Sequence, residues 1–366
     1  MIYWNAEGPC VELGMNVARG CMDIKPDFLQ RPRANWNLVL LNCGAAAGVA
    51  AGFNAPLAGV FFTLEVMQSA IVSTRNERNH EGDNSVLSAA ENLTPVLLSS
   101  VLSALISRAI LGDALVLSLK EYSLQTPLIE LPLYLVLGVI SGFVAFAFSK
   151  SANLSQSFFA GRAGPDEIQG VMKDIPDALK PMIGGLVCGI IALTFPQILF
   201  FGYETLNSLL ANNSLPVTLL LSLLVVKTFT TAVSVGSGLV GGTFAPSLFL
   251  GAMTGASFHN IAKTVLTTAE TTMGYPVFDL ADVPAYAMVG AASVLAALFR
   301  APLTASLLLF EVTRDYDVIL PLMASAGLGS LVGDILQDKD KRRDQDEVSW
   351  GDLADKEKKQ KSLVVK

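Results

Sequence analysis

The amino-acid sequence predicts an all-α, multi-pass membrane protein built as an inverted repeat of tilted and broken helices. Apolar residues make up 52% of its 366 residues and charged residues only 16%, whereas ordinary soluble domains carry about 25% charged residues. Several apolar segments approach the ~20 residues that span a bilayer, and others are short and interrupted by Gly or Pro, as in transporters with broken helices. A large soluble all-α core is the alternative, but the charged residues are concentrated in the loops and the tail.

The chain up to residue 160 alternates apolar helices with polar connectors. Pro9 falls in the first turn of the first helix, where its missing N–H costs nothing. The second helix is rich in Gly and Ala, which allow close helix–helix approach in a membrane. The predicted helices are about 7–20, 36–52, 54–69, 93–111 and 130–160, with polar segments at 21–35, 72–92 and 161–180.

The same alternation continues to residue 337. The predicted helices are about 182–195, 215–234, 244–262, 284–297, 301–313 and 317–337, with a short helix after FGYE (201–204) and a polar loop at 265–283. The composition then changes sharply to charged residues. We therefore expect a transmembrane domain over 1–337 and a charged, disordered tail over 338–366.

Two pairs of segments match between the halves of the chain. FNAPLAGVFFTLE (53–65) and FRAPLTASLLLFE (299–311) share F-x-A-P-L and a Glu nine residues after the Pro. GPCVELG (8–14) and APSLFLG (245–251) share P-x-x-x-L-G. The order is the same in both halves, which indicates a duplicated transporter. Repeats of this kind often have inverted topology, with the substrate bound at their interface.

The stretch GSGLVGGTFAPSLFLG (236–251) joins a glycine-rich loop to the start of an apolar helix. Such a junction exposes backbone N–H groups at a helix N-terminus, which carries roughly half a positive charge and binds anions. Within a bilayer, a break of this kind is tolerated only where it is buried or lines a cavity. One junction in each repeat predicts an anion pathway near the middle of the membrane.

The sequence offers little support for other kinds of chemistry. No nucleophile–base pair, metal-ligand set, phosphate-binding loop or dinucleotide fingerprint is visible. The net charge of −7 comes without a basic patch for nucleic acid. We expect no enzyme activity, no catalytic residue, no metal, no cofactor and no nucleic-acid partner. The remaining candidates for metal or redox chemistry show no paired spacing: Cys10, Cys21, Cys43, Cys188, His80 and His259.

Taken together, the motifs resemble those of the CLC family of chloride channels and anion/proton exchangers. Glu7-Gly8-Pro9 resembles the end of the family's G-[KR]-E-G-P motif, and Gly242-Thr243-Phe244-Ala245-Pro246 resembles its G-x-F-x-P motif. Segments 52–65 and 299–311 are similar to two helices that carry much of the dimer contact in the family. The resemblance covers about 7–337, and the sequence of 313–334 is similar to that of plant and cyanobacterial members.

The resemblance implies a role for each motif residue. Glu7 would be the gating glutamate, whose carboxylate competes with the anion until it is protonated or swings aside. The backbone N–H groups of Gly8, Thr243 and Phe244 would contact the anion. Without the resemblance, Glu7 is an ordinary acid at a helix start, and Phe244 is a core side chain. Three further residues would support the filter motifs: Pro9, Gly242 and Pro246.

Departures from the family pattern shape the functional prediction. The exchangers of the family carry an internal proton-passing glutamate one position after Glu65, where this chain has Val66. Valine cannot titrate, which favours a channel over proton coupling. Glu65 itself is interpreted as a structural intramembrane acid, although such residues are functional candidates by default. The family's first filter segment and its pore tyrosine have no counterpart here, so we expect a protein truncated at both termini.

The main prediction is a voltage- or pH-gated channel for chloride or another small anion. Three alternatives stay open: an anion/proton antiporter, a non-conducting truncated subunit that modulates a full-length partner, and an unrelated inverted-repeat transporter. We expect a homodimer, or a heterodimer with a CLC subunit, through helices near 54–69 and 300–337, in contact with membrane lipid. The membrane of an organelle fits the plant-like wording, and a chloroplast if the source is a plant. The sequence defines neither the anion nor the orientation.

Overall fold

The structure is a computed structural model that describes residues 9–22, 36–67, 85–112, 129–199, 202–212, 215–273 and 280–340. Throughout these ranges the regular structure is helical, without a β-strand. Four helices in this part of the chain are long and apolar enough to cross a membrane: Leu93–Ile110, Leu131–Phe159, Val217–Ser237 and Ile319–Asp340. The chain therefore has the all-α, multi-pass membrane fold that its sequence predicts.

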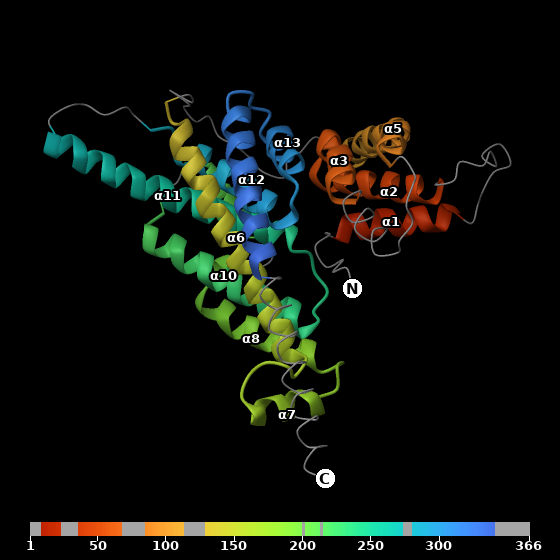
Figure 1. Cartoon of the computed structure of the whole chain (residues 1–366), viewed down its shortest axis with the longest axis horizontal. Coiled ribbons are helices and arrows are strands. Elements are labelled where there is room, and N and C mark those ends of the chain that lie inside the picture. The colour runs from red at the N-terminus through yellow and green to blue at the C-terminus, as the bar shows by residue number, and fades with distance from the viewer. Residues whose placement is uncertain are drawn as a thin grey trace, which may run out of the picture.

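The helices form two groups that are in contact through α3 and α13. The first group lies at one side of the molecule in Figure 1, and the second group contains the long α6, α10, α11 and α12. The first group consists of α1 (Pro9–Met22), α2 (Trp36–Phe53), α3 (Pro56–Phe62), its π-helical continuation η3 (Thr63–Met67) and α5 (Ser85–Leu111).

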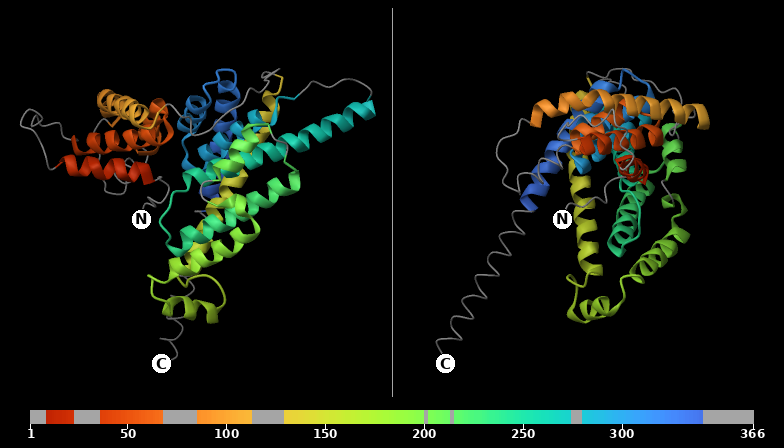
Figure 2. Two further views of the ribbon diagram at one scale, coloured as in Figure 1. Left: turned by 180° about the vertical axis from the view of Figure 1, so that it is seen from behind. Right: turned by 90° about the vertical axis from the view of Figure 1, so that its right-hand side faces the viewer.

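The second group starts with α6 (Leu131–Phe159), α7 (Asp166–Asp174), α8 (Lys180–Thr194), η4 (Pro196–Ile198) and α9 (Tyr203–Leu210). It continues with α10 (Val217–Ser237), α11 (Phe244–Met273), α12 (Val283–Phe299) and α13 (Pro302–Thr313). The helix Ile319–Asp340 follows. α12 is buried along almost its whole length, against α11 on one side and α6 on another. The outer half of α11 projects away from the other helices in Figure 1 and in the left view of Figure 2.

Matched glycines reproduce the sequence repeat in three dimensions. In the first half, Gly14 of α1 lies against the backbone of Gly44 in α2, and in the second half Gly251 of α11 lies against Gly290 of α12. A Cβ added at any of the four would collide with a carbonyl oxygen of the facing helix. Close backbone approach of small residues is a general way in which membrane helices associate. The α1–α2 and α11–α12 pairs are therefore equivalent parts of the two repeats.

Serine hydroxyls join α5 to the small-residue face of α2. Ser99, Ser103 and Ser107 recur every fourth residue, and each donates to a carbonyl oxygen of α2 at 2.8–3.2 Å. Ser100 donates to the carbonyl oxygen of Pro56 at 2.6 Å. Lipid offers no hydrogen-bond partners, so such groups in membrane helices pair across the helix interface. This stripe holds α5 across α2 and α3.

A buried carboxylate joins the starts of α6 and α12. Glu130 is fully buried and accepts hydrogen bonds from the Ala281 amide at 2.9 Å and the Tyr286 hydroxyl at 2.8 Å. The Tyr134 hydroxyl donates a longer one, at 3.4 Å, and the two tyrosine rings stack with their centroids 4.6 Å apart. A buried charge costs much less when its oxygens find donors. The cluster thus fixes α6 against α12 at one end of the main core.

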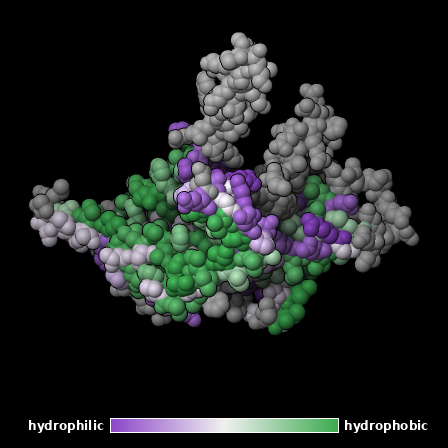
Figure 3. Space-filling view, turned by 90° about the horizontal axis from the view of Figure 1, so that it is seen from below, coloured by the Kyte–Doolittle hydropathy of each residue, from purple (hydrophilic) through white to green (hydrophobic). Residues whose placement is uncertain are grey.

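The outer surface is strongly apolar. Figure 3 shows hydrophobic side chains over much of the face seen from below, with hydrophilic residues gathered in a narrower region. Leu193 of α8 is 87% exposed and Ile110 of α5 is 76% exposed. Exposed apolar area on this scale is unusual for a soluble monomer. It fits contact with lipid acyl chains, in agreement with the spans described above.

Three predicted boundaries are wrong, because polar residues belong to helices. α5 starts at Ser85 inside the predicted loop 72–92, α7 occupies part of the predicted loop 161–180, and α11 continues through 265–273. In the outer part of α11, four threonine hydroxyls donate to carbonyl oxygens four residues back, so these side chains bond within the helix. The last helix runs to Asp340, three residues beyond the predicted helix end at 337. Most of the predicted tail lies outside the described residues.

Candidate functional site

The connection between α10 and α11 places a helix N-terminus inside the protein. Gly238 takes a left-handed conformation (φ 88°), which caps α10 and turns the chain into an irregular stretch, 239–242. The carbonyl oxygen of Thr243 then accepts the first bond of the next helix, from the Ser247 N–H at 3.0 Å. Thr243 and Phe244 are 8% and 7% exposed. The predicted glycine-loop junction is therefore present, and its helix start is buried.

The first turn of α11 presents amide groups that its own carbonyls cannot pair. The N–H groups of Thr243, Phe244 and Ala245 precede the first bonded amide of the helix. Pro246, in the same turn, has no N–H to satisfy. These amides bear the positive end of the helix dipole. A buried turn of this kind is suited to hold a small anion by its backbone.

Two phenylalanine rings flank Phe244, one from each repeat. The ring of Phe53, at the end of α2, lies 4.8 Å from the ring of Phe244 between centroids. The ring of Phe299, at the end of α12, lies 5.5 Å from it. Both residues begin the matched F-x-A-P-L segments, so the sequence repeat already marked them as an equivalent pair. The sequence analysis assigned the two rings no role. The two repeats therefore converge on the first residue of α11.

A cleft of about 320 Å³ lies between the start of α1 and the glycine loop before α11. It is lined by Pro9, Glu12, Val235, Gly238, Leu239, Val240 and Gly241. The cleft thus brings Pro9 of the first predicted junction next to the loop that leads to Thr243. Glu12 supplies a carboxylate there that the sequence analysis did not single out. Glu7 and Gly8 lie outside the described residues, so the gate stays a prediction.

The lone glutamates of the two matched helices exchange partners. Both carboxylate oxygens of Glu311 accept backbone amides at the start of α3, from Leu57 at 2.9 Å and Ala58 at 2.8 Å. The carboxylate of Glu65 accepts the amides of Leu303 at 3.0 Å and Thr304 at 2.7 Å, at the start of α13. The Thr304 hydroxyl adds a further bond at 2.7 Å. Each acid therefore caps the opposite helix, and α3 and α13 run antiparallel.

Val66 lies beside Glu65 in η3, where the α-helix widens into a π-helical turn. Turns of this kind are frequent at functional sites. The Val66 side chain is partly buried against an apolar cluster that includes Val11, Met15 and Phe62. At this position, the proposed place of the internal glutamate, the chain has an aliphatic side chain among apolar neighbours.

A lysine inside α10 was also missed by the sequence analysis. Lys227 is 4% exposed, its Nζ donates to the carbonyl oxygen of Ile198 at 2.7 Å, and it lies 5.4 Å from the ring centroid of Phe249 in α11. A lone lysine in an apolar 21-residue helix was a visible signal. Ionisable groups inside membrane helices are functional candidates by default. Its partners include a carbonyl oxygen and an aromatic face.

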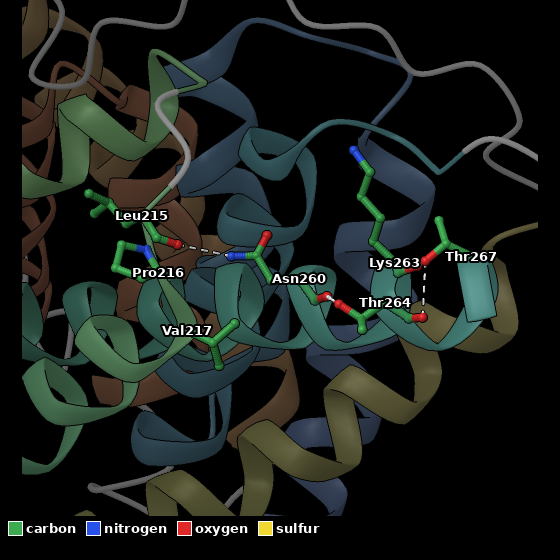
Figure 4. A pocket seen from close by; sticks show the side chains of 7 residues that line it. All are labelled: Leu215, Pro216, Val217, Asn260, Lys263, Thr264 and Thr267. Carbon is green, nitrogen blue, oxygen red and sulfur yellow. Dashed lines mark hydrogen bonds between the residues drawn. The ribbon is translucent and has the colours of Figure 1, made fainter.

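A larger hollow of about 580 Å³ lies along the outer half of α11, away from the glycine loop. Figure 4 shows Leu215 and Pro216 on one side and the side chains of Asn260, Lys263, Thr264 and Thr267 on the other. The Asn260 amide donates to the Leu215 carbonyl at 3.1 Å, and the threonine hydroxyls bond to their own helix. Its polar lining is largely engaged, and it contains none of the motif residues.

The fold and the site define a class of protein: a multi-pass membrane protein with broken helices related by an inverted repeat. The chain matches the family described as voltage gated chloride channel over residues 5–334, and it belongs to that family, the CLC family.

Several characterised proteins are similar to this chain. The chloride channel proteins CLC-e and CLC-f of Arabidopsis thaliana are each 36% identical to it; the matches cover 89% and 88% of this chain but 43% and 38% of the relatives. The H(+)/Cl(-) exchange transporter ClcA of Salmonella arizonae is 32% identical, over 91% of this chain and 62% of its own length. The chain therefore spans between 38% and 62% of the length of these relatives.

Solved structures show the same fold. A slow cyanobacterial Cl-/H+ antiporter aligns with a TM-score of 0.63 at 24% identity, over 89% of this chain and 67% of that one. A CLC-type fluoride/proton antiporter aligns with a TM-score of 0.64 at 19% identity, over 90% of this chain and 70% of that one. These similar proteins include an exchange transporter and two antiporters. They support the antiporter alternative better than the channel that the sequence alone favours.

Proposed function

We propose that this chain transports a small anion, chloride in the first instance, across a membrane, and that it does so by exchange with protons. The observation that carries the proposal is the buried first turn of α11, where the amides of Thr243 and Phe244 face away from any helical acceptor. Fixed N–H dipoles in a water-poor site stabilise an anion without having to reorient, which is why helix starts are effective anion ligands.

The second part of the proposal is the gate. Glu7 precedes Pro9, and Pro9 lines the cleft beside the glycine loop. A deprotonated Glu7 carboxylate would compete with chloride for the same amides, because both are anions that accept hydrogen bonds from N–H groups. Protonation would release that competition, so a proton and an anion would alternate at one place. Exchange is supported by the relative named ClcA and by the antiporter structures.

A channel is the second candidate, and Val66 favours it. A proton that leaves Glu7 would have to reach the other side of the membrane, and Val66 offers no titratable group for that step. Water would have to replace it along an apolar surface. The two candidates differ in one measurable quantity, the number of protons moved per chloride.

The proposal extends to assembly and location. We propose a homodimer through the helices near 54–69 and 300–337. Their outward faces carry exposed apolar side chains, among them Leu57, Leu303 and Leu331. An organelle membrane is proposed as the location because the plant proteins CLC-e and CLC-f are among the similar proteins.

The test is chloride efflux from liposomes that contain the purified chain, with a chloride electrode and a pH electrode in the same vessel. Chloride efflux with proportional proton uptake supports exchange. Chloride efflux without protons overturns exchange and establishes the channel. Well-folded protein without any efflux overturns both, and leaves the non-conducting partner subunit.

A further inference from the structure

The two matched helix breaks share one backbone geometry. Asn54 has φ 54° and Arg300 has φ 56°, both in the left-handed region. The residues that follow are also alike, with φ −128°, ψ 81° at Ala55 and φ −131°, ψ 71° at Ala301. Left-handed conformations at non-glycine residues persist only where the surroundings hold them. Each break therefore needs an anchor.

Side chains from a neighbouring helix anchor both left-handed residues. The Asn54 side-chain oxygen accepts a bond from Arg108 Nε of α5 at 2.6 Å. The Arg300 guanidinium pairs with Asp334 at 2.7 Å and with Asp338 at 3.1 Å, both on the helix Ile319–Asp340. The anchors are chemically different in the two repeats but equivalent in position.

The exchanged glutamates complete the arrangement. We use the name carboxylate clamp for Glu65, Glu311 and the amides that they bind, which belong to Leu57, Ala58, Leu303 and Thr304. The clamp consists of charge-assisted hydrogen bonds, which are roughly twice as strong as neutral ones. It joins residues 254 positions apart in the chain, such as Leu57 and Glu311. It thereby fixes the start of α3 relative to the start of α13.

The clamp lies next to the site through the two breaks. Phe53 lies three residues before Pro56, the first residue of α3, and Phe299 lies three residues before Pro302, the first residue of α13. Both rings pack on Phe244, at 4.8 Å and 5.5 Å between centroids. A change in the separation of the two helix starts would therefore move the two rings relative to Phe244.

We propose that Glu65 and Glu311 are positioning residues for the anion site: by holding α3 against α13, they set the spacing of Phe53 and Phe299 around Phe244, and so the size of anion that the Phe244 amide accepts. The inference rests on the proposed function. It gives the two acids a task in selectivity, in addition to their bonds within the fold.

The test compares iodide and chloride fluxes in liposomes for Glu65→Gln and Glu311→Gln. Glutamine keeps the size of the side chain but replaces one acceptor oxygen with an NH2 group that opposes a backbone N–H. The ratio of iodide to chloride flux does not depend on how much of the protein is folded. We expect this ratio to rise by about threefold or more in each variant. The free energy of a hydrogen bond to a charged group corresponds to more than a threefold change in an equilibrium constant.

Matched variants at one position separate the clamp from general disturbance of α13. Thr304→Val removes the hydroxyl bond to Glu65 and should raise the ratio, whereas Thr304→Ser keeps the bond and should restore the wild-type ratio. Ser306→Ala is the control, because the Ser306 hydroxyl donates at 2.7 Å to Pro302 within its own helix. It should leave the ratio unchanged.

The outcomes distinguish this inference from the proposed function. Wild-type chloride transport with unchanged flux ratios in both glutamine variants overturns the inference and leaves the function standing. A rise in Ser306→Ala equal to that in Thr304→Val overturns it as well. Wild-type protein that neither transports chloride nor binds it in isothermal titration calorimetry overturns both.

Discussion

At the scale of single residues, the proposed ligand at Thr243 is a backbone amide and not a side chain. Thr243→Pro removes that amide, whereas Thr243→Val keeps it and changes only the hydroxyl. A hydrogen bond to a charged group contributes about 1.5–3 kcal/mol, so we expect the chloride Kd to rise roughly 10- to 100-fold in the proline variant. Isothermal titration calorimetry on purified protein measures this, and equal effects of the two substitutions would argue against backbone ligation.

Glu7 belongs to the same scale, and its proposed role predicts the direction of a pH effect. A deprotonated carboxylate occupies the anion position, so the chloride flux of the wild-type chain should rise as the pH falls and the acid is protonated. Glu7→Ala should conduct at neutral pH as fast as the wild type does in acid, with no further response. Chloride efflux recorded between about pH 3.5 and about pH 7.5, a range that brackets the ordinary glutamate pKa of about 4.3, is the measurement. A mutant that keeps the wild-type pH response would remove Glu7 from the gate.

The residues of the site differ in how far the sequence alone could place them. The junction at Thr243 and Phe244 was predictable, because a glycine-rich loop followed by an apolar helix defines a local geometry. The flanking of Phe244 by Phe53 and Phe299 was not predicted, since it depends on how two distant segments meet. Lys227 was missed for a different reason. A single charged residue in an apolar run is visible in the sequence, but the sequence analysis assigned it no role.

At the scale of helices, replacing glycine with alanine should change stability in opposite directions at two positions, one that faces a neighbouring backbone and one that does not. Gly251→Ala places a Cβ against the backbone of Gly290 and Ala291, whereas a Cβ at Gly189 of α8 meets nothing within 4 Å. Overpacking costs typically about 1–3 kcal/mol, and replacing a free helical glycine with alanine gains about 0.5–1 kcal/mol. We expect the unfolding midpoint in detergent to fall for Gly251→Ala and to rise slightly for Gly189→Ala, measured by thermal denaturation. Shifts in the same direction would contradict the close α11–α12 crossing.

The same scale shows what apolar patterning can and cannot predict. Most of the described helices were placed from their apolar runs, and the short helix after residues 201–204 was placed as well, as α9. α7 and the outer part of α11 were not, because they are polar and lie outside the core. In the outer part of α11, side chains such as Thr264 and Thr267 bond to their own helix backbone, which accommodates polar residues in a helical segment. A search for apolar periodicity does not detect that.

At the scale of the whole molecule, the repeat explains why a break in each half leads to one site. The matched segments at 53–65 and 299–311 were recognisable in the sequence, and the antiparallel pairing of their helices follows from the exchange of Glu65 and Glu311. Which side chains would meet between the halves was not predictable, because their contacts join residues more than two hundred positions apart. Inverted repeats typically bind their substrate at the interface between the repeats, and the rings of Phe53 and Phe299 reach Phe244 from both repeats.

The assembly of two chains is the last prediction at this scale. Leu331 lies on the helix Ile319–Asp340, within the proposed dimer region, and is 57% exposed, whereas Val225 of α10 is 63% exposed outside that region. Leu331→Trp should weaken a dimer by disturbing the fit of its apolar face, and Val225→Trp should leave it unchanged, because lipid accommodates a larger side chain where packed protein does not. Chemical cross-linking in liposomes, read as the fraction of protein that migrates as a dimer, measures both variants against the wild type. A dimer fraction reduced equally by the two substitutions would move the interface away from Leu331, and a wild-type chain that stays monomeric would remove the proposed dimer altogether.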